Sequence, residues 1–301
     1  MKIKLEIHLF LQGLASPLTR ANYLSDVRAL EAWFRPFTGQ EDSLAIIKWV
    51  RSMEAANLKR TTIKGRLIRV RRIYALLIEK ELRKTENPVR LDCIGRVRDI
   101  RAPKCPTLDE LKNLTSEIDF STLEGARQGA IFGYLLFEGL RCHEVAGLKL
   151  SDLIKIGDQW QCSVRGKNGV LSEVSLWPQT KKALRKYLSL AKHRHQDTPL
   201  FYSLTRPGNL RLSTRAVRRI IDQLFREAGI RNGLSCHSLR HAHGTLLASM
   251  GVPLSFIQRR LRHTDILTTL RYINDEPSMY QAQHRRPEES FPIKLGHNFE
   301  A

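Results

Sequence analysis

The sequence is poor in cysteine, and the cysteines that it has do not form a recognisable pair. Its 301 residues include five cysteines, and none of them belongs to a Cys-x-x-Cys motif. This pattern is typical of a cytoplasmic protein with reduced thiols, not of a disulfide framework or a zinc knuckle. No apolar run approaches the roughly 20 residues that a membrane span needs. The start, Met1-Lys2-Ile3-Lys4, lacks the apolar segment of a signal peptide, so we expect a cytoplasmic location and no membrane partner.

Motifs that bind nucleotides or metals are also missing. The sequence has no Gly-rich phosphate-binding loop of the Walker type and no acidic cluster that would hold Mg²⁺. His237 and His241 have the four-residue spacing of a zinc-binding helix, but Ser238 stands where zinc proteases carry a glutamate. We therefore expect no metal ion, no ATP and no other cofactor.

What the sequence has in excess is positive charge. It contains 50 Lys and Arg against 30 Asp and Glu, which gives a net charge of +20 and a pI of about 10.1. Residues 1–100 contribute +9 and residues 101–301 contribute +11, so the surplus is not confined to one tail. A surplus of this size predicts a polyanionic partner, for which DNA or RNA is the common choice.

Residues 1–90 predict a domain of helices separated by polar breaks. Apolar residues recur at three- and four-residue steps between positions 23 and 37, and again between positions 63 and 77. Each set falls on one face of a helix, which indicates packing against a core. Thr61 or Thr62 is suited to cap the start of the second helix.

The second of these helices carries an unbalanced run of positive charge. Residues 59–72 hold seven basic residues and no acidic one. A solvated surface behind a core stripe is the ordinary explanation of such charges, but a run without any acidic partner favours contact with DNA. The predicted DNA-binding residues are Lys59, Arg60, Lys64, Arg66, Arg69, Arg71 and Arg72.

A break separates this domain from a second one. Asn87-Pro88 ends the helical pattern, and residues 91–106 are basic and aperiodic, which predicts a linker between domains. The second domain, residues 107–301, opens with Thr107 and Glu110 at the spacing of a helix capping box.

The second domain is predicted to be mainly helical with a small antiparallel sheet. Trp160–Val164 and Glu173–Leu176 have the pattern of short strands, and Asn168-Gly169 between them is a strong turn signal. Helices are expected around residues 131–137, 180–187, 213–228 and 237–250.

Four short motifs in this domain hold residues suited to phosphate chemistry. Each alone has an ordinary explanation, such as a salt bridge, a solvated hairpin tip or a surface histidine. Their occurrence together in a fixed order is harder to explain in that way. In chain order they are Gly139-Leu140-Arg141-Cys142-His143-Glu144, Arg165-Gly166-Lys167-Asn168-Gly169, His237-Ser238-Leu239-Arg240-His241 and Leu261-Arg262-His263, followed by Tyr272.

This ordered set resembles the tyrosine recombinase/integrase family, and the resemblance covers nearly the whole chain. It implies a mainly α fold with a small antiparallel β-sheet: a helical, SAM-like DNA-binding domain followed by a mixed α+β catalytic domain. In size and layout the chain looks closest to Xer-like recombinases, although compact phage, transposon and plasmid enzymes are similar. The implied activity is DNA integration, excision or dimer resolution.

The resemblance implies that Tyr272 is the nucleophile, which forms a 3′-phosphotyrosine. Arg141 and Arg240 would clamp the non-bridging oxygens of the scissile phosphate, and His263 would donate a hydrogen bond to it. The chemistry is consistent, because planar guanidinium groups match the charge that develops on those oxygens. A tyrosine with its ordinary pKa of about 10 needs such a positive field or a nearby base.

Three further roles follow from the same resemblance. Lys167 would be the general acid that protonates the leaving 5′-oxygen, because an alkoxide leaves badly without a proton. His237 would help to take the proton of the tyrosine. Glu144 matches an acidic position that supports the site.

The sequence departs from the family pattern at several places. Glu138 stands where a small or hydroxyl residue is common, Cys236 where proline is common, and Arg262 where glycine is common before His263. None of these changes removes a catalytic group. After Lys167, the usual basic residues are replaced by Leu171, Ser172 and Glu173.

The implied partner is double-stranded DNA with inverted recombination half-sites, bound by a homo- or hetero-tetramer. The tail after Tyr272 would dock on a neighbouring subunit, and a frayed terminus is the alternative. Such an enzyme would be associated with the nucleoid. Two other functions remain open: a type IB topoisomerase, which uses the same nucleophile, and a DNA-binding regulator with an inactive catalytic domain.

Overall fold

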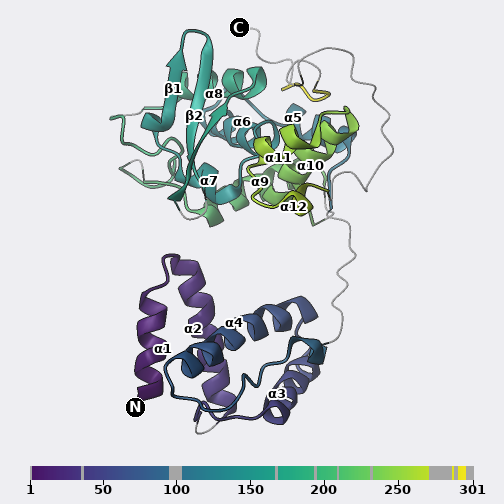
Figure 1. Ribbon diagram of the computed structural model, residues 1–301. Coiled ribbons are helices and arrows are strands. Elements are labelled where there is room, and N and C mark those ends of the chain that lie inside the picture. The colour runs from purple at the N-terminus through teal and green to yellow at the C-terminus, as the bar shows by residue number, and fades with distance from the viewer. Residues whose placement is uncertain are drawn as a thin grey trace. The chain divides into compact units, whose positions relative to one another are not determined.

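A computed structural model describes residues 2–34, 37–94, 104–166, 169–192, 195–208, 210–230, 233–270, 287 and 291–295. The chain divides into two compact units, Met1–Ile100 and Arg101–Ala301. Each unit is described by itself below (Figure 1). The linker predicted over residues 91–106 includes residues 95–103, which lie outside the described part, so its extent stays a prediction.

The first unit is helical. Two of its helices begin at side-chain caps, because Ser16 accepts a hydrogen bond from the Thr19 backbone N–H at 3.3 Å and Asp42 from that of Ala45 at 2.7 Å. Its elements are α1 (Lys2–Gln12), α2 (Pro17–Trp33), α3 (Ser43–Ala55), α4 (Arg60–Glu79) and the short 3₁₀ helix η1 (Leu91–Ile94).

The apolar stripe predicted for residues 63–77 is the buried face of α4. Its members are fully buried in the core of the first unit, which confirms that prediction. The predicted threonine cap is wrong, because Lys59 precedes the helix without a side-chain cap and both threonines lie inside the first turn. The stripe predicted over residues 23–37 extends beyond the helix, because α2 ends at Trp33 and Phe37 follows it. Trp33 is 47% exposed, so it does not belong to the buried face.

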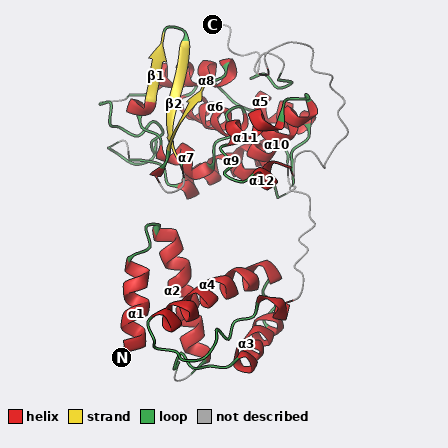
Figure 2. Cartoon of the chain, in the orientation of Figure 1, coloured by secondary structure: helices red, strands yellow, loops and turns green. Residues whose placement is uncertain are grey.

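The second unit is a helical body with one small sheet at its edge (Figure 2). Thr107 and Glu110 form the predicted capping box at the start of its first helix. Its elements are α5 (Leu108–Ser116), α6 (Leu123–Leu136), α7 (Cys142–Gly147), η2 (Leu150–Asp152), β1 (Leu153–Ile156), β2 (Gln159–Arg165), β3 (Leu171–Ser175), α8 (Pro178–Leu190), α9 (Thr214–Glu227), α10 (Cys236–Ser249), α11 (Leu254–Leu261) and α12 (Ile266–Leu270).

The sheet has one strand more than the sequence predicts. Its order is β1-β2-β3 and both pairings are antiparallel, with Leu153 opposite Cys162 and Cys162 opposite Val174. The predicted pair corresponds to β2 and β3. Strand β1 is missing from the prediction because it has only four residues, Leu-Ile-Lys-Ile, which is too short for a clear pattern, and its burial does not alternate along the strand.

Helix α6 forms the centre of the second unit. Every residue from Gly125 to Leu136 is buried, and α8 and α10 pack against the helix. Phe291 and Ile293 from the end of the chain are also buried in this core, with the Phe291 ring 5.7 Å from that of Phe137. Among the described helices, none has the length and apolar character that a membrane span requires. The buried helix α6 ends at Leu136, shortly before the motif Gly139–Glu144 begins.

Candidate active site

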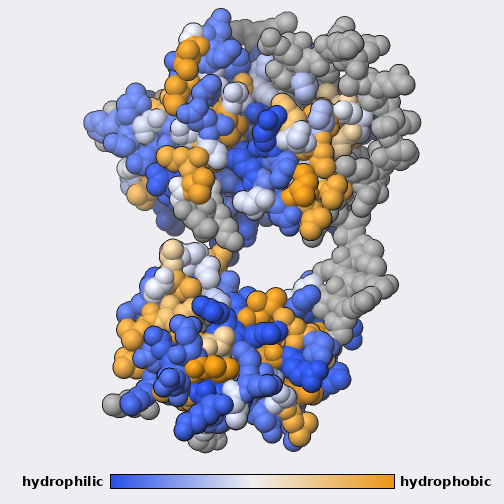
Figure 3. Space-filling view, in the orientation of Figure 1, coloured by the Kyte–Doolittle hydropathy of each residue, from blue (hydrophilic) through white to orange (hydrophobic). Residues whose placement is uncertain are grey.

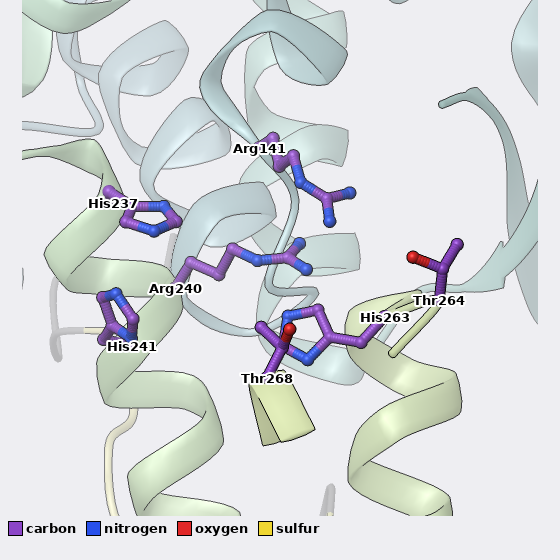
Figure 4. A pocket seen from close by; sticks show the side chains of 7 residues that line it. All are labelled: Arg141, His237, Arg240, His241, His263, Thr264 and Thr268. Carbon is purple, nitrogen blue, oxygen red and sulfur yellow. The ribbon is translucent and has the colours of Figure 1, made fainter. Parts of the chain in front are cut away.

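A pocket of about 190 Å³ brings together three of the four predicted motifs. The guanidinium groups of Arg141 and Arg240 and the imidazole of His263 point toward the same space (Figure 4). They come from the start of α7, from α10 and from the turn between α11 and α12. The pocket is lined by Arg141, His237, Arg240, His241, His263, Thr264 and Thr268.

The first motif turns sharply because of Gly139. Its φ is +60°, and a Cβ at this position would lie 2.8 Å from the Leu261 side chain and 2.9 Å from the His243 ring. Only glycine combines this backbone angle with this close approach. The turn brings the chain from the end of α6 to Arg141, the residue that precedes α7.

Arg240 is the most buried cation of the site, with 1% of its surface exposed. Its Nη1 donates to the carbonyl of Gly139 and its Nη2 to the carbonyl of Leu261. A buried guanidinium needs such acceptors, because an unpaired charge in the interior is costly. These bonds orient Arg240 and link α10 to both neighbouring motifs.

Arg141 is held by Glu144, the acid to which the family resemblance assigns a supporting role. Glu144 accepts from the Arg141 backbone N–H at 2.7 Å and from Arg141 Nη1 at 2.9 Å. A third bond, 2.9 Å long, comes from Arg262 Nη2. Burial opposes the charge on Glu144, but the two arginines outweigh it and hold the pKa of this carboxyl below its ordinary value.

His263 follows α11 and is oriented by Thr269. Its Nδ1 lies 2.9 Å from the Thr269 hydroxyl oxygen, and Thr269 is fully buried. Burial, with the positive charges of Arg240 and Arg141, lowers the pKa of His263 to about 4. The ring is therefore neutral at physiological pH. If the Thr269 hydroxyl donates to Nδ1, the ring proton is on Nε2 and is available for donation.

His237 and His241 lie one turn apart on α10, with their ring centroids 4.4 Å apart. Partial burial, with the charges of Arg240 and Arg141, lowers the pKa of His237. A neutral imidazole is able to accept a proton, which suits the predicted role of His237. No role is predicted for His241. Its four-residue spacing from His237 already indicates that both side chains lie on the same face of the helix. Within the described residues, no cluster of His, Cys, Asp and Glu is suited to hold a metal ion.

Two of the predicted catalytic residues lie outside the part of the chain that the structure describes. They are Lys167, which follows β2, and Tyr272, which follows α12. Their roles stay predictions. Three threonines of the site, Thr264, Thr268 and Thr269, lie between His263 and Tyr272 in the sequence. Nothing in their residue type indicates a role, so the sequence alone does not identify them.

The structure shows where three departures from the family pattern lie. Glu138 is fully buried and accepts from the Trp177 backbone N–H at 2.8 Å and from the Arg260 guanidinium. Arg262 ends α11 in the left-handed conformation, at φ 52° and ψ 48°. Cys236 is buried in the first turn of α10.

The predicted DNA-binding residues, which lie on α4 and directly before it, divide into two groups. Arg66 and Arg69 form salt bridges of 3.0 and 2.5 Å with Asp26 of α2, which is 2% exposed. These two arginines therefore stabilise the fold of the first unit. The other five predicted residues are exposed: Lys59, Arg60, Lys64, Arg71 and Arg72. Figure 3 shows strongly hydrophilic side chains over this unit, with apolar ones between them.

Comparisons with known proteins agree with this architecture. Residues 107–279 match the phage integrase family, and residues 4–81 match the phage integrase N-terminal SAM-like domain. Tyrosine recombinase XerD of Oceanobacillus iheyensis is 30% identical over 234 residues, which cover 75% of this chain and 76% of the relative. Tyrosine recombinase XerC of Thermodesulfovibrio yellowstonii is 28% identical over 88% of each chain.

Solved structures show the same fold. The XerH site-specific recombinase in a post-cleavage complex with palindromic difH substrate has a TM-score of 0.72 at 18% identity, over 86% of this chain and 76% of that one. The Tn1549 transposon integrase in complex with circular intermediate DNA has a TM-score of 0.73 at 17% identity, over 91% and 96%. With one family match over more than half of its length, this chain belongs to the phage integrase family of tyrosine recombinases.

Proposed function

We propose that this protein is a site-specific recombinase that cuts and rejoins double-stranded DNA through a 3′-phosphotyrosine bond to Tyr272. The observation that carries the proposal is the convergence of Arg141, Arg240 and a neutral His263 on one pocket. Two guanidinium groups and one N–H donor match the non-bridging oxygens of a phosphodiester, which gain charge during in-line attack.

The cleavage step follows from these roles. The Tyr272 oxygen attacks the scissile phosphorus, His237 accepts the phenolic proton, and the bond from phosphorus to the 5′-oxygen breaks. Lys167 donates a proton to that oxygen, which leaves as a 5′-hydroxyl. Arg141 and Arg240 compensate the charge on the non-bridging oxygens throughout, and His263 adds a hydrogen bond to one of them.

Rejoining reverses the step on a different strand. The 5′-hydroxyl of a partner strand attacks the phosphotyrosine, and Tyr272 leaves as it regains its proton. One phosphodiester bond is replaced by one phosphotyrosine bond and then by another phosphodiester, so no external energy source is needed. The residues of the pocket supply positive charge and proton transfer, and we propose that the reaction uses no cofactor.

We also propose how the DNA is held. The exposed basic residues of α4 would contact the phosphate backbone, because neutralised phosphates release counterions and so drive binding. The relatives of known structure include a recombinase on a palindromic substrate and a lambda integrase dimer on a core site, which supports inverted half-sites as the target. A protein that acts on such DNA would work in the cytoplasm, in association with the nucleoid.

Assembly on such a site would need four subunits, joined in part by the tail after Tyr272. Of this tail, the structure describes Pro287 and residues 291–295. The Phe291 ring packs 5.2 Å from Trp177 and 5.9 Å from His243 of the same chain. An aromatic anchor that fits its own domain is also suited to the same site on a neighbour.

Two assays test the proposal. Supercoiled plasmid carrying two target sites should yield recombinants; relaxed circles alone would indicate a topoisomerase, and unchanged plasmid would indicate a DNA-binding regulator. On nicked substrates that trap the covalent intermediate, Tyr272→Phe should keep DNA binding and lose the adduct, whereas Tyr280→Phe should form it. An adduct that persists in Tyr272→Phe and disappears in Tyr280→Phe would refute the assignment of the nucleophile.

A further inference from the structure

Glu144 shares its buried carboxylate between two arginines from different motifs. Its side chain is fully buried, and its oxygens accept from Arg141 Nη1 and Arg262 Nη2, both at 2.9 Å. The Arg141 backbone N–H makes a third bond at 2.7 Å. The three side chains therefore form one connected group with two positive charges and one negative charge.

The two arginines differ in what else they face. Arg141 lines the pocket and its side chain is 33% exposed. Arg262 is not among the residues that line the pocket, and its side chain is 12% exposed. Its Nη1 donates to the Arg260 carbonyl at 3.1 Å, so both terminal nitrogens of Arg262 are engaged within the protein. Arg262 therefore reaches the site through Glu144.

The backbone of Arg262 is in a conformation that disfavours an ordinary side chain. Among the described residues, only Asn57, Glu81 and Arg262 have positive φ without being glycine. A residue held in this region needs surrounding interactions that compensate for the strain. The bonds from Arg262 to Glu144 and to the Arg260 carbonyl are such interactions.

The charge balance suggests why this pairing matters. An isolated Arg141–Glu144 pair has no net charge, so an incoming phosphate would gain little from Arg141 and would face the carboxylate. With Arg262 bonded to the same carboxylate, the group keeps a net charge of one positive unit. In a partly buried site, where the effective dielectric constant is well below that of water, such a difference is large.

We propose that Arg262 is a positioning residue that neutralises Glu144 and so leaves the charge of Arg141 available to the scissile phosphate. This inference rests on the proposed role of Arg141 as a phosphate clamp. Glu144 fixes the direction of Arg141, and Arg262 offsets the charge that Glu144 introduces. The site then has the orientation that a buried acid provides and keeps its attraction for phosphate.

The test measures the single-turnover rate of covalent adduct formation on nicked DNA at saturating protein, beside the Kd for DNA. Arg262→Gln, which removes the charge and leaves a shorter polar side chain, should slow adduct formation roughly 10- to 100-fold. The Kd should change by less than about threefold, because most phosphate contacts lie elsewhere. Arg262→Lys, which keeps the charge, should recover much of the rate.

A double variant separates charge compensation from a general structural role. In Glu144→Gln, the carboxylate charge is gone, so adding Arg262→Gln should slow the reaction far less than it does in the wild-type background. Arg259→Gln is the matched control, because it removes one exposed positive charge from the same helix and should react like wild type.

The possible outcomes are distinct. Any of three results would overturn the inference. Arg262→Gln would react as fast as wild type, or Arg259→Gln would lose as much rate as Arg262→Gln, or Arg262→Gln would cause the same loss in the Glu144→Gln background as in wild type. If Arg262→Gln melts early and cannot be assayed, Arg262→Gly, which suits the left-handed backbone, takes its place in the same comparison with Arg262→Lys. If wild type forms no adduct at all, the proposed function fails instead.

Discussion

The guanidinium of Arg240 donates a hydrogen bond to the backbone carbonyl of Gly139, 101 positions earlier in the chain. The second bond of Arg240, to the Leu261 carbonyl, adds the motif Leu261-Arg262-His263 to the same group of bonds. The predicted phosphate ligand Arg240 is thus positioned by main-chain groups, which a change of neighbouring side chains does not remove. The rigidity of the pocket depends on the backbone path at Gly139.

Gly139→Ala should therefore destabilise the second unit by about 2–4 kcal/mol, because the new methyl group combines a disfavoured φ with close contacts. Urea unfolding of the full chain measures this change. Gly157→Ala is the matched control: Gly157 also has positive φ, at +57°, but no atom lies within 4 Å of its added Cβ. The control should lose only about 1 kcal/mol, and equal losses in both variants would show that close packing at Gly139 is unimportant.

The stability of the protein should fall as the pH is lowered through the titration of His263. Its pKa in the folded state is about 4, lower than the ordinary value of 6.5, so the unfolded chain binds the proton more readily. The contribution is complete above pH 6.5 and is lost as the pH falls toward 4. The pKa values of His237 and His243 are lowered as well, so they add to the same trend.

Urea unfolding at about pH 7 and about pH 5 checks this pH dependence. His263→Gln removes the titrating group and should narrow the difference between the two free energies of unfolding. A variant that loses as much stability as wild type between these pH values would show that His263 does not contribute to the dependence.

Charge reversal of exposed residues on α4 should weaken DNA binding and reduce its dependence on salt. Arg71→Glu with Arg72→Glu removes two exposed positive charges. Each phosphate that the protein no longer neutralises should lower the slope of log Kd against log salt by about 0.9. An unchanged slope would mean that this face of α4 does not bind DNA.

Arg69→Ala should behave differently, because Arg69 bonds to the buried Asp26. We expect it to lower the free energy of unfolding of the first unit by about 1–3 kcal/mol, since a buried carboxylate then keeps only one of its two arginine partners. Thermal melting monitored by circular dichroism measures this change. A melting temperature equal to that of wild type would contradict the structural role.

Lys167 should be identified by a change of leaving group. Lys167→Ala should slow cleavage of ordinary DNA by about 10²–10⁴-fold, the range of general acid catalysis. Sulfur at the 5′-bridging position should restore much of the rate, because a thiolate leaves without a proton. Arg141→Ala should gain nothing from the same substrate, since its defect concerns the non-bridging oxygens. Absence of rescue in Lys167→Ala would direct attention to Lys149, Lys155 and Arg165.

The sequence by itself determined the family, the two-domain order and most of the pocket. The motifs around Arg141, Arg240 and His263 are readable because each is a short local pattern, and the pocket does contain all three. The stripe of α4 and the capping box at Thr107 are equally local, since both follow from residues three or four positions apart.

Only the tertiary structure decided which charges serve the fold and which face outward. Arg66 and Arg69 look like their neighbours in sequence, but their partner Asp26 lies 40 and 43 positions earlier on another helix. Arg262 and Glu144 are 118 positions apart, so no local pattern connects them. Ion pairs between distant elements depend on how those elements pack, and packing is a property of the whole core.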